Sequence, residues 1–423
     1  MREAFTRFFR FAAKVFFRRI EVVGLENIPP HAPVIFAVNH PNGLVDPLFV
    51  LCFAPRPVSF LAKAPLFRYP LIGWFARTFE GIPVYRKQDN VAGSNRETFA
   101  RSRQVLAKGG AIAIFPEGTT HSDARLKELK TGAARIALGA GLPEIAVIPT
   151  GIYYTEKYTF RSDALVWFGE PIAVQAAPVD EEGEPAPAPV EQLTRTIERR
   201  LAEVTLQADS HAALDLVQRA ERIFTAGDAA LAEELEIRKR FVDGYLYLCE
   251  HDRLRLAHLE SEIARFESEL HALRLDPETL RAHGVRVSFT SLAILLVLLP
   301  IAVAAGILNY PTYRLIGALA NRFSKRESEM TATLKFIAAL LLYPLTWIAI
   351  ALAIGWRFGP WPALAALLAQ PLGAWLALRV SERLDEVIGR ARALVRRRAR
   401  NQLLKQRERL REEFLAVAAE MNG

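Results

Sequence analysis

Cysteine is scarce in this sequence. Its 423 residues include two, Cys52 and Cys249, which are too few for a disulfide framework or a four-cysteine zinc site. We therefore expect the protein to reside in a reducing compartment. The sequence also lacks a Gly-X-Y period, which excludes a collagen-like protein, and with 51% hydrophobic residues it is too apolar to be disordered. Its length predicts two or three domains.

The net charge of +8 is concentrated at the two ends of the chain. Residues 1–19 hold six basic residues and one acidic residue, and residues 379–412 hold twelve basic and five acidic residues. Residues 178–284, by contrast, hold 13 basic and 23 acidic residues. Basic segments bind nucleic acids or anionic lipids. The charge alone does not favour either partner, so the long apolar runs are used to choose between them.

Three long runs carry no charged residue: 287–313, 336–356 and 358–378, which are 27, 21 and 21 residues long. Each reaches the roughly 20 residues that a helix needs to cross the bilayer core. Arg357 separates the second run from the third, and nearby glycines and prolines favour a tight turn. We therefore predict a transmembrane helical hairpin over residues 336–378. A buried hairpin in a soluble protein is the alternative, although two adjacent runs of this length are rare in soluble domains.

The first run is interrupted by Pro300, and Asn309 and Pro311 follow. We predict a membrane segment at residues 285–320 that either spans the bilayer as one helix or re-enters it as a kinked hairpin. Basic residues flank this run on both sides, whereas the loop between the other two runs holds only Arg357. If the basic flanks are cytoplasmic, the first run must return to its starting side, which favours the re-entrant form.

This topology predicts an integral membrane protein. The part of the chain before the apolar runs and the basic helical tail, residues 379–423, would face the cytoplasm at the bacterial inner membrane or, in a eukaryote, at the endoplasmic reticulum. Because the tail directly follows a membrane hairpin, anionic membrane lipid is the predicted partner and nucleic acid is not.

Residues 1–20 interleave phenylalanine with arginine and lysine, without the uninterrupted apolar core of a signal peptide. This pattern predicts an amphipathic basic helix that lies in the membrane interface. The alternative is an ordinary helix that packs on its own domain.

Residues 21–177 alternate short β-like runs with helical patterns, which is typical of an α/β domain. A loop rich in proline and glutamate follows at 178–190, and 191–284 is a charged helical region. Between Leu256 and Leu273, apolar residues recur every three or four positions, which predicts one apolar stripe for helix packing. The predicted strands are Val34–Val38, Val58–Leu61, Ala111–Phe115, Ile145–Pro149 and Leu165–Phe168.

A first candidate motif follows the strand at Val34–Val38. It reads Asn-His-Pro-Asn-Gly-Leu-Val-Asp and contains His40 and Asp46. A carboxylate on the same turn as a histidine can hold the imidazole tautomer while the other ring nitrogen takes a proton from a substrate. A loop histidine without a catalytic role is the alternative.

Three further segments repeat the design of a strand followed by a turn. Residues 81–86 form a β-like run that ends in Arg86, whose guanidinium suits bidentate phosphate binding. The next strand ends in Pro-Glu-Gly, which places Glu117 at the carboxyl end of a strand, where α/β sheets carry their sites. Gly118 lets the backbone approach a ligand closely. Residues 146–151 are the last of the four segments.

In this order and spacing, the four segments resemble the four motifs of the glycerolipid acyltransferase superfamily. The resemblance is closest to the glycerol-3-phosphate/dihydroxyacetone-phosphate acyltransferases of the yeast type, and it covers roughly residues 20–275. It implies a mixed sheet flanked by helices, followed by a helical region and C-terminal transmembrane helices. The residues that carry it are 39–48 (NHPNGLVDPL), 115–123 with Leu-Lys-Thr-Gly-Ala at 129–133, and Phe-Arg-Ser at 160–162 with Phe-Gly-Glu-Pro-Ile at 168–172.

The resemblance implies a role for each matching residue. His40 would be the general base that deprotonates the acceptor hydroxyl, and Asp46 would orient it. The acceptor would be bound by Arg86, Glu117 and Gly118. Lys63 would stabilise an oxyanion or a phosphate, Thr119 and Arg161 would be further substrate-binding residues, and Pro149 would shape the acyl-chain pocket.

Two positions depart from the common motifs. Five residues separate His40 from Asp46, as in the yeast-type subgroup, whereas the common first motif of the superfamily has four. Thr120 stands where many lysophosphatidate acyltransferases carry a basic residue. A phosphate ligand is therefore sought among Arg161, Lys130 and His121.

These features together predict a membrane-bound O-acyltransferase of phospholipid biosynthesis. It would transfer a fatty acyl chain from acyl-CoA or acyl carrier protein to glycerol 3-phosphate, with dihydroxyacetone phosphate as a further acceptor. Lysophosphatidate is the alternative acceptor, and a non-catalytic membrane scaffold is the alternative of another class. We expect direct transfer without a metal or a cofactor, because the sequence shows neither a metal-ligand cluster nor a Gly-x-Ser-x-Gly nucleophile elbow in the domain.

Overall fold

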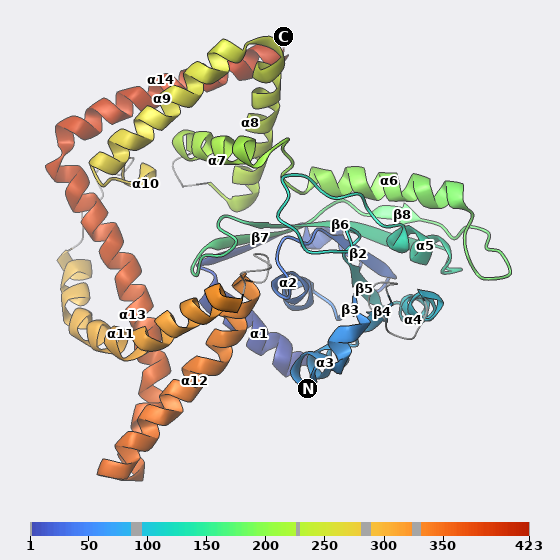
Figure 1. Cartoon of the computed structure of the whole chain (residues 1–423), viewed down its shortest axis with the longest axis horizontal. Helices are drawn as coiled ribbons and strands as arrows, with labels where there is room; N and C mark the ends of the chain where they lie inside the picture. The colour runs from blue at the N-terminus through green and yellow to red at the C-terminus, as the bar shows by residue number, and fades with distance from the viewer. Residues whose placement is uncertain (1, 86–94, 226–228, 281–288, 324–330, 423) are drawn as a thin grey trace. The chain divides into compact units, whose positions relative to one another are not determined.

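The computed structural model describes residues 2–85, 95–225, 229–280, 289–323 and 331–422. Contacts within the chain divide it into two compact units (Figure 1). The first unit comprises Met1–His211 with Glu327–Thr333, and the second comprises Ala212–Arg326 with Leu334–Gly423.

The first unit is built on a mixed sheet. Its strands are β1 (Arg19–Val23), β2 (Val34–Val38), β3 (Val58–Lys63), β4 (Ile82–Val84), β5 (Ala111–Ile114), β6 (Ile145–Tyr154), β7 (Asp163–Phe168) and β8 (Ile172–Val174). They lie in the order β1-β7-β6-β2-β5-β3-β4, with β8 beside β6. The central strands β6, β2, β5, β3 and β4 are parallel, whereas β7 and β8 run antiparallel to β6. The predicted α/β class with a mixed sheet is confirmed.

Helices cover both faces of this sheet. Side chains alternate between the two faces along each strand, and in β2 all five are buried, so both faces need a covering layer. On one face Ile35, Ile112 and Val147 form a core with α4, α5 and α6. On the other face the Phe36 ring contacts Phe168, and Phe17 contacts Phe49 of α2. The helices of this unit are α1 (Arg2–Phe16), α2 (Val45–Phe53), α3 (Pro70–Thr78), α4 (Asn95–Ala107), α5 (Gly132–Leu138) and α6 (Pro187–Glu203).

The division between the units falls later than the sequence suggested. The sequence predicts that the loop at 178–190 ends the α/β domain, but α6 begins inside this segment, at Pro187, and belongs to the first unit. The reason is that α6 buries Val190, Leu193, Ile197 and Leu201 in the same core as the sheet.

Helix α1 lies where the sequence predicts an amphipathic helix, and it packs on its own domain. Phe9 contacts Phe75 with ring centroids 5.4 Å apart, and Phe5 contacts Trp74 at 4.8 Å. The outer face keeps Phe8 and Phe11 exposed, at 50% and 65%, beside basic residues. Membrane contact by α1 stays a prediction, and these side chains are the ones that would make it.

The second unit begins with a helical bundle. Its helices are α7 (His211–Thr225), α8 (Leu231–His251), α9 (Arg253–Ala272), α10 (Pro277–Leu280) and the C-terminal α14 (Arg397–Asn422). The predicted apolar stripe is present: Leu259, Ile263, Phe266 and Leu270 of α9 are buried in a cluster that includes residues of α14. The acidic helical region thus packs against part of the basic tail, and Arg255 forms a 2.8 Å ion pair with Glu420.

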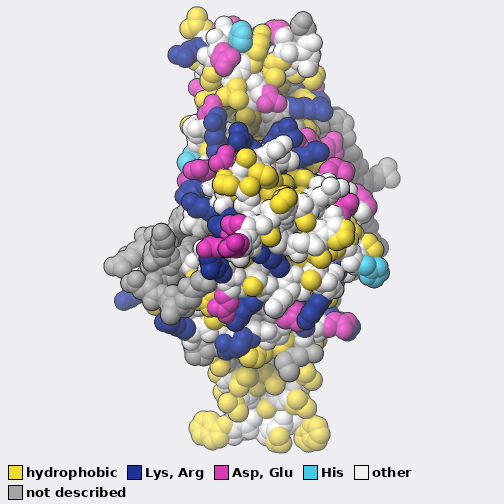
Figure 2. All heavy atoms as spheres, turned by 90° about the vertical axis from the view of Figure 1, so that its right-hand side faces the viewer, with side chains coloured by type: hydrophobic (Ala, Val, Ile, Leu, Met, Phe, Trp, Pro, Cys, Tyr) yellow, Lys and Arg dark blue, Asp and Glu magenta, His cyan; other side chains and the backbone are white. Residues whose placement is uncertain are grey.

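Three helices of the C-terminal region are long and apolar enough to cross a membrane. They are α11 (Phe289–Phe323), α12 (Thr331–Phe358) and α13 (Pro360–Val395). Helices α12 and α13 meet at Gly359, whose φ of 92° allows the abrupt turn. Hydrophobic side chains dominate the end where these two helices meet (Figure 2), and Trp356 and Trp361 are exposed there.

Polar side chains join the apolar helices to one another, as is usual where helices associate in lipid. The Trp347 indole N–H donates to Asn309 Oδ1 at 2.9 Å, and the hydroxyls of Thr312 and Thr346 are 2.8 Å apart. The Gln370 amide donates to the Trp347 carbonyl at 3.4 Å. These contacts link α11 to α12 and α12 to α13.

The segment predicted at 285–320 forms a single helix over its described part. Helix α11 contains Pro300 and Pro311 and is bent in Figure 1, as proline within a helix causes. Residues 285–288 lie outside the described part of the chain. The spanning and the re-entrant course both stay predictions.

A buried ion pair holds α7 to α8. Arg238 Nη2 lies 2.8 Å from Glu221 Oε2, and both side chains are almost fully buried. We expect Arg238→Met to destabilise the protein by about 3–5 kcal/mol, because it leaves the Glu221 carboxylate buried without its cation. The double variant Arg238→Met/Glu221→Leu should recover most of this loss in thermal unfolding.

The pH dependence of the single variant provides a control. Burial raises the pKa of Glu221 to about 7, so this group favours the folded state below its unfolded pKa of about 4.5, and that contribution is lost as the pH rises through about 7. Removal of Arg238 should raise the pKa of Glu221 further, because no cation then offsets burial. Arg238→Met should therefore be least destabilised near pH 5. Equal destabilisation at pH 5 and pH 8, or no recovery in the double variant, would contradict a role for the buried pair.

Candidate active site

The predicted motifs converge at one edge of the sheet. Because β2, β5, β3 and β4 are parallel and adjacent, their carboxyl ends meet at the same edge, where α/β proteins bind ligands. His40 follows β2, Glu117 follows β5 and Lys63 ends β3. Arg86 lies outside the described residues.

His40 and Asp46 form a hydrogen-bonded dyad. His40 Nδ1 lies 2.8 Å from Asp46 Oδ2. The Asp46 side chain is fully buried in the first turn of α2, where the helix dipole favours a negative charge, and the His40 side chain is 16% exposed. Since an ionised carboxylate only accepts hydrogen bonds, Nδ1 carries the proton and Nε2 keeps its lone pair. The ring is further held by stacking on Phe115, with centroids 4.2 Å apart.

Two more donors hold the Asp46 carboxylate. The backbone N–H of Asn42 donates to Oδ2 at 2.6 Å, and the Tyr154 hydroxyl donates to Oδ1 at 2.7 Å. Burial raises the pKa of Asp46, while the hydrogen bonds from His40, Tyr154 and Asn42 lower it. The pKa of Asp46 thus lies above its ordinary value, and the hydrogen bonds offset part of the effect of burial while they hold the carboxyl against the imidazole.

Tyr154 was not predicted from the sequence. It lies at the far end of β6, which is longer than the predicted strand Ile145–Pro149. Burial raises the pKa of Tyr154 well above its ordinary value, so the phenol stays protonated and donates. The sequence pattern of β6 could have placed Tyr154 on the same face of the sheet as Ile152, because side chains alternate along a strand. It could not have revealed the contact with Asp46, which is 108 residues away.

Glu117 joins the loop after β2 to the loop after β5. Its Oε1 accepts the backbone N–H of His40 at 2.9 Å, and its Oε2 accepts the backbone N–H of Lys127 at 3.0 Å and contacts His121 Nε2. The side chain is buried, so its oxygens are occupied by these groups. Glu117 therefore positions His40, and its predicted contact with an acceptor stays a prediction.

The other candidate residues near Glu117 differ in their exposure to solvent. Gly118 has a φ of 71°, and its N–H donates to the Phe115 carbonyl at 3.0 Å, so glycine is required by this tight turn. Thr119 and Lys130 are exposed. His121, a candidate phosphate ligand, is instead buried against Glu117.

The remaining predicted residues are placed as follows. Lys63 is exposed beside Val84 of β4, and Pro149 is buried in β6 beside Ala37 of β2. Arg161 caps α1: its guanidinium donates to the carbonyls of Val15 and Phe17 at 3.2 and 3.1 Å, where a cation is favourable. The structure thus brings Lys63 to the edge that carries His40 and engages Arg161 with α1.

The sheet edge carries a histidine–aspartate dyad, and the part of the chain that contains it is similar to known acyltransferases. The Acyltransferase family model matches residues 19–153. Residues 19–153 are therefore similar to acyltransferase domains, as the motifs predicted.

Individual relatives divide between two acceptor types. The chain is 26% identical to glycerol-3-phosphate O-acyltransferase 2 of Saccharomyces cerevisiae, over 60% of this chain and 37% of the yeast protein. It is 30% identical to the chloroplast 1-acyl-sn-glycerol-3-phosphate acyltransferase LPAT1 of Arabidopsis thaliana, over 36% of this chain and 42% of the plant protein. The chain therefore spans less than half the length of each of these curated relatives.

A solved structure was also found. The 1-acyl-sn-glycerophosphate acyltransferase PlsC of Thermotoga maritima is 22% identical, covers 48% of this chain and 78% of its own, and has a TM-score of 0.36. This similarity is too low to support a conclusion.

Removing the Tyr154 hydroxyl tests the network around Asp46. We expect Tyr154→Phe to lower kcat for acyl transfer roughly tenfold with little change in KM, because a hydrogen bond to a charged group contributes about 1.5–3 kcal/mol. The pKa of Asp46 should rise without this donor, so activity should be lost at a higher pH on the acid side.

Tyr153→Phe is the matched control, because Tyr153 is the adjacent residue and points to the opposite face of the sheet. An unchanged pH–rate profile for Tyr154→Phe, or an equal effect of both variants, would show that the hydroxyl does not act through Asp46.

Proposed function

We propose that this protein is a membrane-bound acyltransferase that transfers a fatty acyl chain from a thioester donor, acyl-CoA or acyl carrier protein, to glycerol 3-phosphate. The observation that carries the proposal is the dyad: Asp46, itself held by Tyr154, contacts His40 at Nδ1, and Nε2 has no hydrogen-bond partner among the described residues and can accept a proton. The similarity to the yeast glycerol-3-phosphate O-acyltransferases supports the choice of acceptor. Dihydroxyacetone phosphate is included as a second acceptor on the strength of the yeast-type motifs.

The reaction follows from these groups. His40 Nε2 takes the proton of the acceptor hydroxyl as its oxygen attacks the thioester carbonyl. The C–S bond of the resulting tetrahedral intermediate then breaks, and the thiolate takes the proton back from the imidazolium, which Asp46 stabilises. General-base catalysis of this kind contributes a factor of about 10²–10⁴, and positioning of the two reactants contributes up to about 7–11 kcal/mol.

The described residues favour direct transfer over a covalent intermediate. The thiol of Cys52 is buried, and burial raises its pKa to about 12, so it is a poor nucleophile at neutral pH. The donor already carries an activated acyl group. We therefore assign no covalent acyl-enzyme step.

The acceptor phosphate needs cations at the same edge of the sheet. Lys63 is exposed there at the end of β3, and Arg86 follows β4 in the sequence; we propose both as phosphate ligands. Asn42 supports a polar ligand beside the dyad, because its buried side-chain amide has no hydrogen-bond partner among the described residues. Arg161 and His121 are left out of this assignment because other groups occupy them.

Lysophosphatidate is the second candidate acceptor. The 30% identity to a 1-acyl-sn-glycerol-3-phosphate acyltransferase favours it. A non-catalytic scaffold is disfavoured, because it would have no need of a buried carboxylate held by three donors.

For the membrane, we propose that α11–α13 anchor the protein and that the catalytic domain and the basic tail face the cytoplasm. The basic flanks of the apolar segments support this orientation. Anionic lipid would contact the exposed cations, and the lipid product would leave directly into the bilayer.

An acyl-transfer assay with the purified protein tests the activity. Labelled glycerol 3-phosphate, dihydroxyacetone phosphate and lysophosphatidate are compared as acceptors, each with acyl-CoA and acyl carrier protein donors. We expect glycerol 3-phosphate to be used best and His40→Ala to lower kcat by about 10²–10⁴. His258→Ala, at an exposed position of α9, is the matched control. Equal transfer by wild type and His40→Ala would refute the assignment of the base.

The outer face of α1 can be tested without removing the helix. We expect Phe8→Ser/Phe11→Ser to reduce activity several-fold on anionic vesicles, because two exposed aromatic side chains would no longer enter the interface. Activity in detergent and the unfolding temperature should not change, since neither side chain is buried. Equal loss in vesicles and detergent would show that α1 acts through the fold instead.

A further inference from the structure

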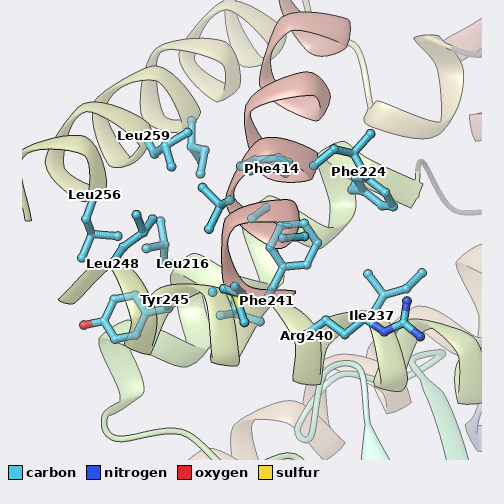
Figure 3. A pocket seen from close by; sticks show the side chains of 18 residues that line it. Leu216, Phe224, Ile237, Arg240, Phe241, Tyr245, Leu248, Leu256, Leu259 and Phe414 are labelled. Carbon is cyan, nitrogen blue, oxygen red and sulfur yellow. The ribbon is translucent and has the colours of Figure 1, made fainter. Parts of the chain in front are cut away.

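The second unit contains an apolar cavity far along the sequence from the acyltransferase motifs. It has a volume of about 170 Å³ and lies among α7, α8, α9 and α14 (Figure 3). Its lining is apolar except for Arg240 and Tyr245, and the labelled leucine and phenylalanine side chains point toward one another. This pocket is partly open to solvent. Because an apolar cavity of about 150 Å³ binds benzene, the pocket is large enough for a hydrocarbon group.

A glycine keeps the cavity open. Gly244 lies in the middle of α8, on the face that also carries Phe241 and Leu248. A Cβ at this position would lie 3.7 Å from Val417 Cγ1 and 3.8 Å from Met421 Sδ, which are ordinary contacts. Alanine would therefore fit and would favour the helix by about 0.5–1 kcal/mol, whereas glycine leaves the space unfilled.

One cation lies at the end of this cavity. Arg238 and Lys239 on the same helix are paired with Glu221 and Glu236, at 2.8 and 2.6 Å. Arg240 is exposed and, among the described residues, has no hydrogen bond or ion pair. In Figure 3 it lies at one end of the lining, beside Ile237, and the Tyr245 hydroxyl points away from the group.

We propose that this cavity binds the anion of a medium-chain fatty acid, with the end of the alkyl chain inside and the carboxylate on Arg240. A guanidinium pairs with one carboxylate through two parallel hydrogen bonds. By comparison with benzene in the smaller cavity, the space holds about six carbon atoms. The phosphate of lysophosphatidate and the coenzyme of an acyl-CoA carry more negative charge than one arginine balances.

This site is independent of acyl transfer, because all its lining residues belong to the second unit and the dyad belongs to the first. A failure of the proposed acyl-transfer function would leave it untouched. A binding measurement that does not involve turnover therefore tests it.

The test is isothermal titration of the full chain in lipid nanodiscs with decanoate, after subtraction of the same titration into empty nanodiscs. We expect saturable binding of one decanoate and tighter binding than for decanol, which lacks the charge. Arg240→Gln should weaken decanoate about tenfold and remove its advantage over decanol. Arg409→Gln, at an exposed arginine of α14 that is not part of the lining, is the matched control and should bind as wild type does.

Substitutions that fill the cavity at Gly244 provide a second test of the proposal. Gly244→Leu should abolish binding, and Gly244→Ala, which fits the space, should weaken it while keeping or raising the unfolding temperature. His40→Ala should bind decanoate normally, which distinguishes this cavity from an acyl-chain site at the dyad. Absence of saturable binding, equal binding by wild type and Arg240→Gln, or decanoate binding that neither Gly244→Ala nor Gly244→Leu changes would overturn the proposal.

Discussion

The buried charge of Asp46 is the constraint on which the arrangement of the catalytic domain depends. A carboxylate without solvent stays ionised only if donors surround it, and here those donors come from three places: the His40 ring, the Asn42 backbone and the Tyr154 hydroxyl. The loop after β2, the first turn of α2 and the far end of β6 must therefore meet at one point. Glu117 adds a fourth element by fixing the backbone of His40, so His40 is held through both its ring and its main chain.

Much of this arrangement could be predicted from the sequence, because apolar runs and turn residues are local signals. The predicted strands, the apolar stripe of α9 and the hairpin of α12 and α13 were found where the patterns indicated. What the sequence could not reveal are partners distant along the chain. Tyr154 reaches Asp46 across 108 residues, and Arg161 reaches Phe17 across 144. A glutamate and an arginine in family motifs suggest ligand binding, and only the fold shows that backbone groups occupy them.

Some charged residues of the C-terminal tail make contacts within the second unit. The acidic helical region and the basic tail pack on one another through the apolar faces of α9 and α14. Their ion pair joins a cation of the acidic region, Arg255, to an acid of the tail, Glu420. Arg407 of α14 is buried and donates to the carbonyls of Ile223 and Phe224. Some of the positive charge at the C-terminus therefore stabilises the second unit, and only the exposed remainder is free for lipid.

The connection between α12 and α13 at Gly359 is as short as a helix connection can be. Helices of 28 and 36 residues are joined there by one residue, so the connection contains no loop to glycosylate, cleave or recognise. If the hairpin crosses the bilayer, the compartment beyond it meets little more than a turn flanked by two tryptophans. A ligand on that side would find, on the described residues of this hairpin, only the ends of two helices to contact.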